Sequence, residues 1–312
     1  MDTHAHHRRL EEPSGAGPGQ EAHAFPLSGA MTIRPGIVRA SLSLLAILVV
    51  AGCATRRAPD LEIDRSIQAV SQDSRVRFIV LHYTAGDDRA SLLTLSRGDV
   101  SAHYLVTDTQ PVHVYQLVPE DRNAWHAGAS SWYGHTSINN ASIGIEIVNG
   151  GDTRAPDGTL RWAPFHENQI QAVMLLVRDI ARRHGVRPEN IVAHSDVAPQ
   201  RKVDPGPLFP WHRLADAGLG RWYDVKAAPL FQAFFAKNGL PDAGWFQHRL
   251  RLAGYPVPDS GILDDQTRRV IAAFQMHYRP ARYDGIPDAE TAALLLALPV
   301  AEQEQQPADG TG

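Results

Sequence analysis

Two histidines end short apolar strands in this sequence, and a carboxylate follows the second one closely. His82 comes after residues 78–81, His194 comes after residues 191–193, and Asp204 lies ten residues beyond His194. Two imidazoles and one carboxylate leave a fourth position open on a metal ion, which is typical of catalytic zinc. A metal in such a site lowers the pKa of water and polarises a carbonyl group. Because the chain contains 15 histidines, spacing alone also allows ordinary core or turn histidines.

A glutamate and a lysine could complete this chemistry. Glu146 lies in residues 142–148, where alternating isoleucines predict a strand with Glu146 on the same face as Gly144. A carboxylate beside a metal can act as a general base towards water. Lys202 precedes Asp204 by two residues, so an extended segment points both side chains the same way, and a cation there favours a developing oxyanion. The alternatives are a surface carboxylate on an edge strand and a solvated loop charge.

Positioning these residues requires a sheet, and the chain alternates strand and helix patterns. A helix is predicted over residues 167–184, where one apolar stripe ends at Gly185, and a short helix should follow the cap Asp87. Strands interleaved with helices predict an α/β domain with a central mixed β-sheet flanked by helices. The strands are expected at residues 77–82, 103–107, 112–116, 142–148 and 190–194.

The last quarter of the chain has a different pattern. From about residue 231, three amphipathic segments separated by Gly/Pro turns predict a compact three-helix module, and D-x-x-T sequences supply helix caps. The predicted helices cover residues 245–252, 265–278 and 288–298.

The N-terminal region resembles a bacterial lipoprotein signal. The apolar run at residues 44–50 follows Arg34 and Arg39 and is shorter than the ~20 residues that span a membrane. It ends in VAGC, which resembles a lipobox and implies a lipid on Cys53 and cleavage before it. Cys53 is the single cysteine, which excludes an internal disulfide or a CxxC site. The alternatives are an ordinary signal with an incidental cysteine, or a buried core helix.

These patterns divide the chain into six expected segments. Residues 1–30 precede Met31, are rich in Gly, Pro and His, and are interpreted as a non-native or disordered extension. The others are a signal peptide (31–52), a tether (53–74), a catalytic domain (75–225), a helical domain (231–299) and a disordered tail (300–312). The net charge of −4, from 30 Lys+Arg against 34 Asp+Glu, gives no basic field for nucleic acid.

Five motifs, in this order, resemble the zinc-dependent N-acetylmuramoyl-L-alanine amidases, whose fold is shared with peptidoglycan recognition proteins. Within that family the pattern is most similar to the periplasmic anhydromuramyl-peptide amidase lipoproteins. The motifs are LHYTAG at 81–86, SAHYLV at 101–106, AWHAG at 124–128, NNASIGIEIVN at 139–149 and VAHSDVAPQRKVDPG at 192–206.

The resemblance implies roles for individual residues. It assigns His82, His194 and Asp204 as ligands of Zn²⁺, Glu146 as the general base and Lys202 as the group that stabilises the oxyanion.

Other residues of the motifs have weaker assignments. The substrate-binding candidates are His126, Tyr83 and Asn140, although a turn histidine, a packed tyrosine and a turn-forming asparagine are the alternatives. Asp196, in the HSD turn, is expected to accept a local backbone hydrogen bond.

The helical module resembles the peptidoglycan-binding domain, with a packing domain that binds no ligand as the alternative. The predicted function is hydrolysis of the amide between (anhydro)N-acetylmuramic acid and L-alanine of peptidoglycan stem peptides. The rival is a non-catalytic peptidoglycan sensor on the same fold; a serine hydrolase is disfavoured because the chain has no G-x-S-x-G. Ala54 after the lipidated cysteine favours the periplasmic face of the outer membrane, with the membrane contacted by the lipid anchor alone. A monomer is expected.

Overall fold

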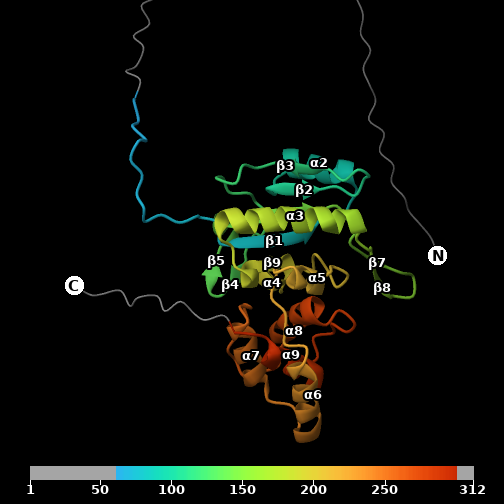
Figure 1. Cartoon of the computed structure of the whole chain (residues 1–312). Coiled ribbons are helices and arrows are strands. Elements are labelled where there is room, and N and C mark those ends of the chain that lie inside the picture. The colour runs from blue at the N-terminus through green and yellow to red at the C-terminus, as the bar shows by residue number, and fades with distance from the viewer. Residues whose placement is uncertain (1–60, 301–312) are drawn as a thin grey trace, which may run out of the picture. The chain divides into compact units, whose positions relative to one another are not determined.

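A computed structural model describes residues 61–300 of the chain (Figure 1). The chain divides into two compact units, Met1–Ala69 and Val70–Gly312, and the fold below is that of the second. The predicted extension, the signal peptide, Cys53 and residues 301–312 of the predicted tail lie outside the described residues. Within residues 61–300, none of the helices is both long and apolar enough to cross a membrane.

A five-stranded mixed sheet lies at the centre, in the order β3-β2-β6-β1-β9. The pairs from β2 to β9 are parallel, and the edge strand β3 pairs antiparallel with β2, so the predicted mixed sheet is confirmed. Its strands are β1 (Phe78–Tyr83), β2 (Tyr104–Val106), β3 (Val114–Gln116), β6 (Ser142–Ile147) and β9 (Ile191–Ala193). Two hairpins lie outside it, β4 (Ser131–Trp132) with β5 (His135–Thr136) and β7 (Asp152–Arg154) with β8 (Leu160–Trp162).

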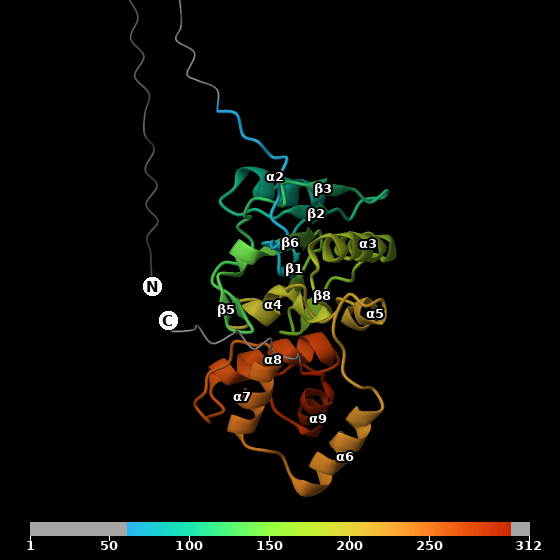
Figure 2. The same ribbon diagram turned by 60° about the vertical axis from the view of Figure 1, so that its left-hand side comes forward.

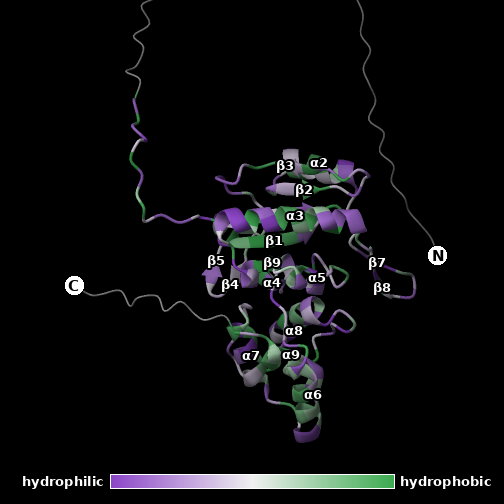
Figure 3. Cartoon of the chain, viewed as in Figure 1, coloured by the Kyte–Doolittle hydropathy of each residue, from purple (hydrophilic) through white to green (hydrophobic). Residues whose placement is uncertain are grey.

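Helix α3 (Glu167–His184) has the predicted bounds and covers one face of the sheet (Figure 1). Its apolar stripe, green in Figure 3, packs in one cluster with Ile79 and Leu81 of β1. Gly185 ends the helix with a φ of 69°, a left-handed conformation that glycine adopts without steric cost. The shorter α2 (Asp88–Arg97) begins at the predicted cap, because the Asp87 side chain accepts a hydrogen bond from the Ala90 N–H.

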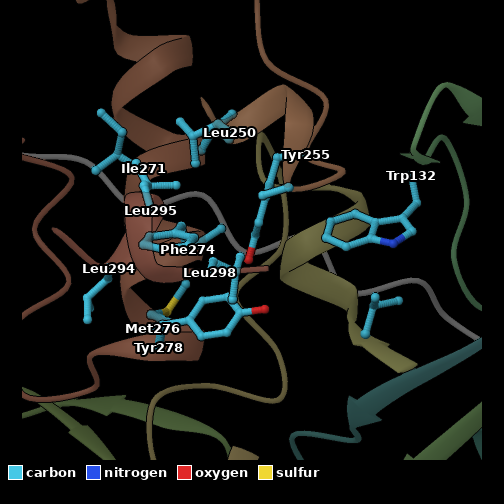
Figure 4. Close-up of a cluster of buried hydrophobic side chains, with 14 of the residues drawn as sticks. Trp132, Leu250, Tyr255, Ile271, Phe274, Met276, Tyr278, Leu294, Leu295 and Leu298 are labelled. Carbon is cyan, nitrogen blue, oxygen red and sulfur yellow. The ribbon is translucent and has the colours of Figure 1, made fainter. Parts of the chain in front are cut away.

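The opposite face of the sheet is covered by α4 (His194–Val197) and by the C-terminal helices. Phe78 and Val80 alternate with the residues that face α3, and they share an apolar cluster with Val197 and with Phe274 of the helical module. Figure 4 shows this cluster, with Trp132 of β4 reaching towards Tyr255. The remaining short helices are η1 (Ile138–Ala141), η2 (Pro188–Asn190) and α5 (Trp211–Asp216).

The C-terminal module contains the three predicted helices and an additional one before them. Asp242, Asp264 and Asp288 cap the three predicted helices, each accepting a hydrogen bond from the N–H three residues ahead. The additional helix α6 was not predicted; the Asp224 side chain accepts hydrogen bonds from the N–H groups of Lys226 (2.8 Å) and Ala227 (3.1 Å) at its start, and the helix packs on α9. The helices are α6 (Ala227–Asn238), α7 (Ala243–Leu252), α8 (Asp265–Tyr278) and α9 (Ala289–Ala297), seen below the sheet in Figure 2.

Candidate metal centre and substrate cleft

Three neighbouring parallel strands bring polar groups to one edge of the sheet. His82 of β1 pairs in register with Glu146 of β6, and Leu81 pairs with Ala193 of β9, immediately before His194. Because these strands run in the same direction, their carboxyl ends meet, and the side chains that follow them gather at one place. The edge of the sheet therefore holds two histidines and a glutamate.

Asp204 reaches the same place from the loop after α4. The Ser195 N–H donates to the Asp204 carbonyl oxygen (2.9 Å), which folds the loop back onto the first turn of α4. The Asp204 Oδ2 lies 3.2 Å from His82 Nδ1 and 3.0 Å from His194 Nδ1, and the two Nδ1 atoms are 2.9 Å apart. Among the described residues, His82, His194 and Asp204 form a group whose potential ligand atoms lie close enough together to hold a metal ion.

The three atoms fit a zinc ion. Ligand atoms of tetrahedral zinc, at about 2.0–2.1 Å from the metal, are about 3.3 Å apart. His194 Nε2 lies 3.2 Å from the Ala127 carbonyl oxygen, which can only accept, so Nε2 carries the proton and Nδ1 is free to bind a metal. All three residues are buried, and two imidazole lone pairs and a carboxylate converge with no donor between them.

His126 lies behind His82 and orients it. Its Nδ1 is 3.0 Å from His82 Nε2, and its Nε2 is 3.1 Å from the Ser142 hydroxyl, so His82 presents Nδ1 to the centre. The ring lies directly over Gly144, where a Cβ atom would be 2.4 Å from it. His126 also lines the cleft described below. Its predicted contact with substrate stays a prediction, in addition to its contact with His82.

Burial and hydrogen bonding separate the protonation states of the centre. Burial and the neighbouring His194 lower the pKa of His82 to about 4. Burial raises the pKa of Asp204, but its close contacts with His194 and His82 outweigh burial and lower that pKa below its ordinary value. Burial and the nearby Asp204 carboxylate raise the pKa of Glu146 well above its ordinary value. Neutral imidazole and ionised carboxylate are the forms that bind metals.

Glu146 and Lys202 lie beside the three ligands. Glu146 Oε1 is 4.0 Å from His82 Nδ1, and its buried Oε2 has no hydrogen-bond partner among the described residues. Lys202 lines the same cleft as Glu146, and its charge opposes the rise in the pKa of Glu146.

An open cleft of about 500 Å³ leads to the centre. The exposed Trp125 and Arg201 lie in its wall, and Ser91 places a buried hydroxyl there without a partner among the described residues. Arg201 was not predicted; its guanidinium donates to the carbonyl oxygens of Ala127 and of Ala129 (2.9 Å) and so fixes the loop after His126. In the sequence, Arg201 could have been noticed only as a charged residue next to Lys202 in RKVDPG.

The two remaining substrate candidates differ in position. Tyr83 lines the cleft, and its hydroxyl donates to Asp152 (3.0 Å). Asn140 is exposed at the amino end of β6, where its Oδ1 accepts from Asn123 (3.3 Å), and it is not among the residues that line the cleft. Asn140 lies in η1, before β6 begins, and the strand from Ser142 to Glu146 alone spans roughly 13 Å. The structure therefore does not bring Asn140 to the site.

Fold and site together define an amidase, and the appended helices are similar to a peptidoglycan-binding domain. The family model for N-acetylmuramoyl-L-alanine amidase matches residues 72–207, and a model for a peptidoglycan-binding domain matches residues 240–295.

Individual amidases are similar to this chain over most of its length. The chain is 44% identical to the N-acetylmuramoyl-L-alanine amidase AmiD of Escherichia coli K12, over 81% of this chain and 94% of AmiD. The structure of AmiD with anhydro-N-acetylmuramic acid-L-Ala-D-gamma-Glu-L-Lys has a TM-score of 0.70 at 43% identity, covering 78% of this chain and 95% of that one. AmpDH3 of Pseudomonas aeruginosa has a TM-score of 0.71 at 40% identity, covering 77% and 98%. The chain belongs to the N-acetylmuramoyl-L-alanine amidase family.

Proposed function

We propose that this amidase is a zinc enzyme, with the metal held by His82, His194 and Asp204, and that it cuts the amide between N-acetylmuramic acid and L-alanine of a stem peptide. The observation that carries the proposal is the convergence of two Nδ1 atoms and one Oδ2 atom within 3.2 Å of one another. Zinc, when bound, supplies a Lewis acid that polarises the amide carbonyl and lowers the pKa of water.

Glu146 moves the proton of the reaction. It takes a proton from the water whose oxygen attacks the amide carbonyl carbon, and it delivers that proton to the L-alanine nitrogen as the carbon–nitrogen bond breaks. The second proton of the water also passes to the released nitrogen, so the products are a lactyl carboxylate and an ammonium group, and atoms and charge balance. The unpartnered Oε2 supports this role, because a buried carboxylate oxygen without a donor is available to accept a proton.

Lys202 and the cleft position the substrate. The Lys202 ammonium stabilises the negative charge that develops on the carbonyl oxygen, and the cleft wall from Trp125 to Tyr83 receives the glycan and peptide portions. The anhydro form of the sugar is the proposed substrate because AmiD was crystallised with an anhydromuramyl peptide and AmpDH3 with an anhydromuramic pentapeptide.

Muropeptide cleavage with and without metal tests the proposal. The purified protein should release free stem peptide from anhydromuropeptides, lose this activity on chelation and recover it when zinc is added. A zinc-loaded protein that binds muropeptide without cutting it would instead establish the sensor. Activity that survives complete removal of the metal would contradict the zinc assignment.

The envelope location is part of the proposal. The VAGC sequence supports a lipid on Cys53, and Ala54 after it supports a place at the periplasmic face of the outer membrane. A monomer is the proposed state there. Metabolic labelling with a fatty acid should mark the wild-type protein and not Cys53→Ser, and density-gradient fractionation should find the labelled protein with outer membranes. A labelled Cys53→Ser variant would contradict this attachment site.

A further inference from the structure

Asp196, two residues after His194, is fully buried, and each of its carboxylate oxygens is bonded. Oδ2 accepts from the Ala193 N–H (2.8 Å), which is the predicted local backbone bond. Oδ1 accepts from the Tyr255 hydroxyl (2.8 Å), and His277 Nδ1 lies 2.8 Å from Oδ2. Since an ionised carboxylate can only accept, Nδ1 of His277 donates. The carboxylate thus joins the backbone before a metal-binding histidine to two side chains of the helical module.

Both donors are held rigidly by aromatic packing. The His277 ring stacks between Trp211 (centroids 4.1 Å apart, 16° between planes) and Tyr278 (4.2 Å, 19°). Tyr255 lies edge-on to Trp132 (5.0 Å). Burial and the Asp196 carboxylate raise the pKa of Tyr255 well above its ordinary value, so its hydroxyl remains a donor. Neither donor can leave Asp196 without opening this packing.

The loop between His194 and Asp204 is bonded to α8, the helix that carries His277, at a second place. The Gln200 side-chain amide donates to the main-chain carbonyl oxygen of Gln266 (3.0 Å), and the main-chain carbonyl oxygen of Gln200 accepts from the Arg269 guanidinium (2.9 Å). Gln266 and Arg269 both lie on α8. The segment from His194 to Asp204 is therefore held by α8 at its beginning and in its middle.

The apolar core continues through the same boundary. Phe78 and Val80 of the sheet, Val197 of α4 and Phe274 of α8 belong to a single cluster of buried side chains. A module attached for wall binding alone requires only a linker. Here it covers a face of the catalytic sheet and supplies partners to the metal-binding segment.

We propose that Tyr255 and His277 are positioning residues for the metal centre, and that the helical module acts as a fixed support for the segment that carries His194 and Asp204. The inference rests on the proposed zinc site. Asp196 transmits the support, because its carboxylate ties the backbone N–H of Ala193, the residue immediately before His194. Small displacements of a ligand weaken metal binding and misplace the catalytic groups.

Two substitutions at His277 separate the hydrogen bond from the packing. His277→Phe keeps a ring between Trp211 and Tyr278 but removes the donor, whereas His277→Asn places an amide N–H at the position of Nδ1 and loses the stack. We expect His277→Phe to raise the zinc dissociation constant about tenfold, measured by competition with a chromogenic chelator, and to lower kcat with little change in KM. His277→Asn should restore most of the zinc affinity. Tyr255→Phe, which removes a single oxygen atom, should act in the same direction.

A matched control lies two residues earlier on α8. Gln275 is fully buried and bonds only inside the module, to the Ile286 carbonyl oxygen (3.0 Å), the Thr291 hydroxyl (2.9 Å) and the Gly285 N–H (2.9 Å), among the hydrogen bonds of the described residues. Gln275→Leu should destabilise the module in urea unfolding of the metal-free protein and leave the zinc dissociation constant unchanged.

The outcomes distinguish this inference from the proposed function. Wild-type zinc affinity in both His277→Phe and Tyr255→Phe would overturn the positioning role, as would an equal loss of zinc in Gln275→Leu, which would make the effect one of stability. A wild-type protein that binds no zinc would overturn the proposed metal centre itself.

Discussion

The metal centre and the cluster around Glu120 both bring titratable side chains together, but they differ in how their polar atoms are satisfied. Glu120 accepts hydrogen bonds from the Tyr104 hydroxyl (2.6 Å), from Arg183 (2.8 Å) and from His184 (2.9 Å). Both of its oxygens have donors, and a guanidinium balances its charge. This cluster is complete without a ligand.

The polar atoms of the candidate metal centre are not satisfied in this way. The facing atoms of His82, His194 and Asp204 are all suited to accept or coordinate, and the buried Oε2 of Glu146 has no partner in the described part of the chain. Unpaired polar atoms in a low-dielectric site are costly, and those of the candidate centre lie beside an open cleft where a ligand can satisfy them. Clustering alone therefore does not separate the two sites, whereas open acceptors beside a cleft do.

Replacing one histidine in each cluster should give the largest contrast. His194→Ala removes a ligand, and we expect loss of bound zinc and a fall in amidase activity of more than about 10³-fold, because the Lewis acid is lost. His184→Ala removes a histidine from the Glu120 cluster and should keep both the bound zinc and the amidase activity. Zinc content and release of stem peptide, measured on the same preparations, check the pair. Stoichiometric zinc in His194→Ala would refute the ligand assignment.

The two glutamates should differ in turnover. Glu146→Gln keeps the shape of the side chain but cannot accept a proton, so we expect full zinc content and a kcat about 10³-fold lower. Glu120→Gln should have the kcat of the wild type. Steady-state kinetics on an anhydromuropeptide provide the test, and wild-type turnover in Glu146→Gln would show that another group is the base.

The sequence predicted the elements that carry their own local signals. The apolar stripe of α3 and Gly185 indicated both ends of that helix, and the aspartate caps marked α8 and α9. The grouping of His82 with His194 was predictable because apolar strands ending in polar residues align when they are parallel.

What the sequence missed depends on position in space rather than on residue type. Asn140 belongs to the same motif as Glu146 but lies at the other end of β6, and a motif does not show which end of a strand faces the site. The partners of Asp196 are 59 and 81 residues away, beyond the reach of any local pattern. Helix α6 is the exception, because the Asp224 side chain that accepts hydrogen bonds at its start is a local signal that was overlooked.

Lys202 should contribute less than Glu146, because it stabilises charge without transferring a proton. We expect Lys202→Met to keep its zinc and to lower kcat about 10²-fold, the size typical of losing one group that stabilises an oxyanion. Lys202→Arg keeps the charge and should recover part of that loss. If kcat is the same in Lys202→Met as in the wild type, the lysine is only a solvated loop charge.

The smallest effect should be in the Glu120 cluster, and it should appear in stability rather than in turnover. Hydrogen bonds from Arg183, opposed by burial, lower the pKa of Glu120 from 4.5 to about 2. A carboxyl group with a depressed pKa stabilises the folded state fully above its unfolded pKa and loses that contribution as the pH falls towards the folded value. Glu120→Gln should therefore lower the free energy of unfolding by about 2 kcal/mol at pH 7, and the difference from the wild type should shrink between pH 4.5 and pH 2. Urea unfolding at pH 7 and at about pH 3.5 measures both values, and a difference independent of pH would show that the stabilisation comes from packing rather than from the charge.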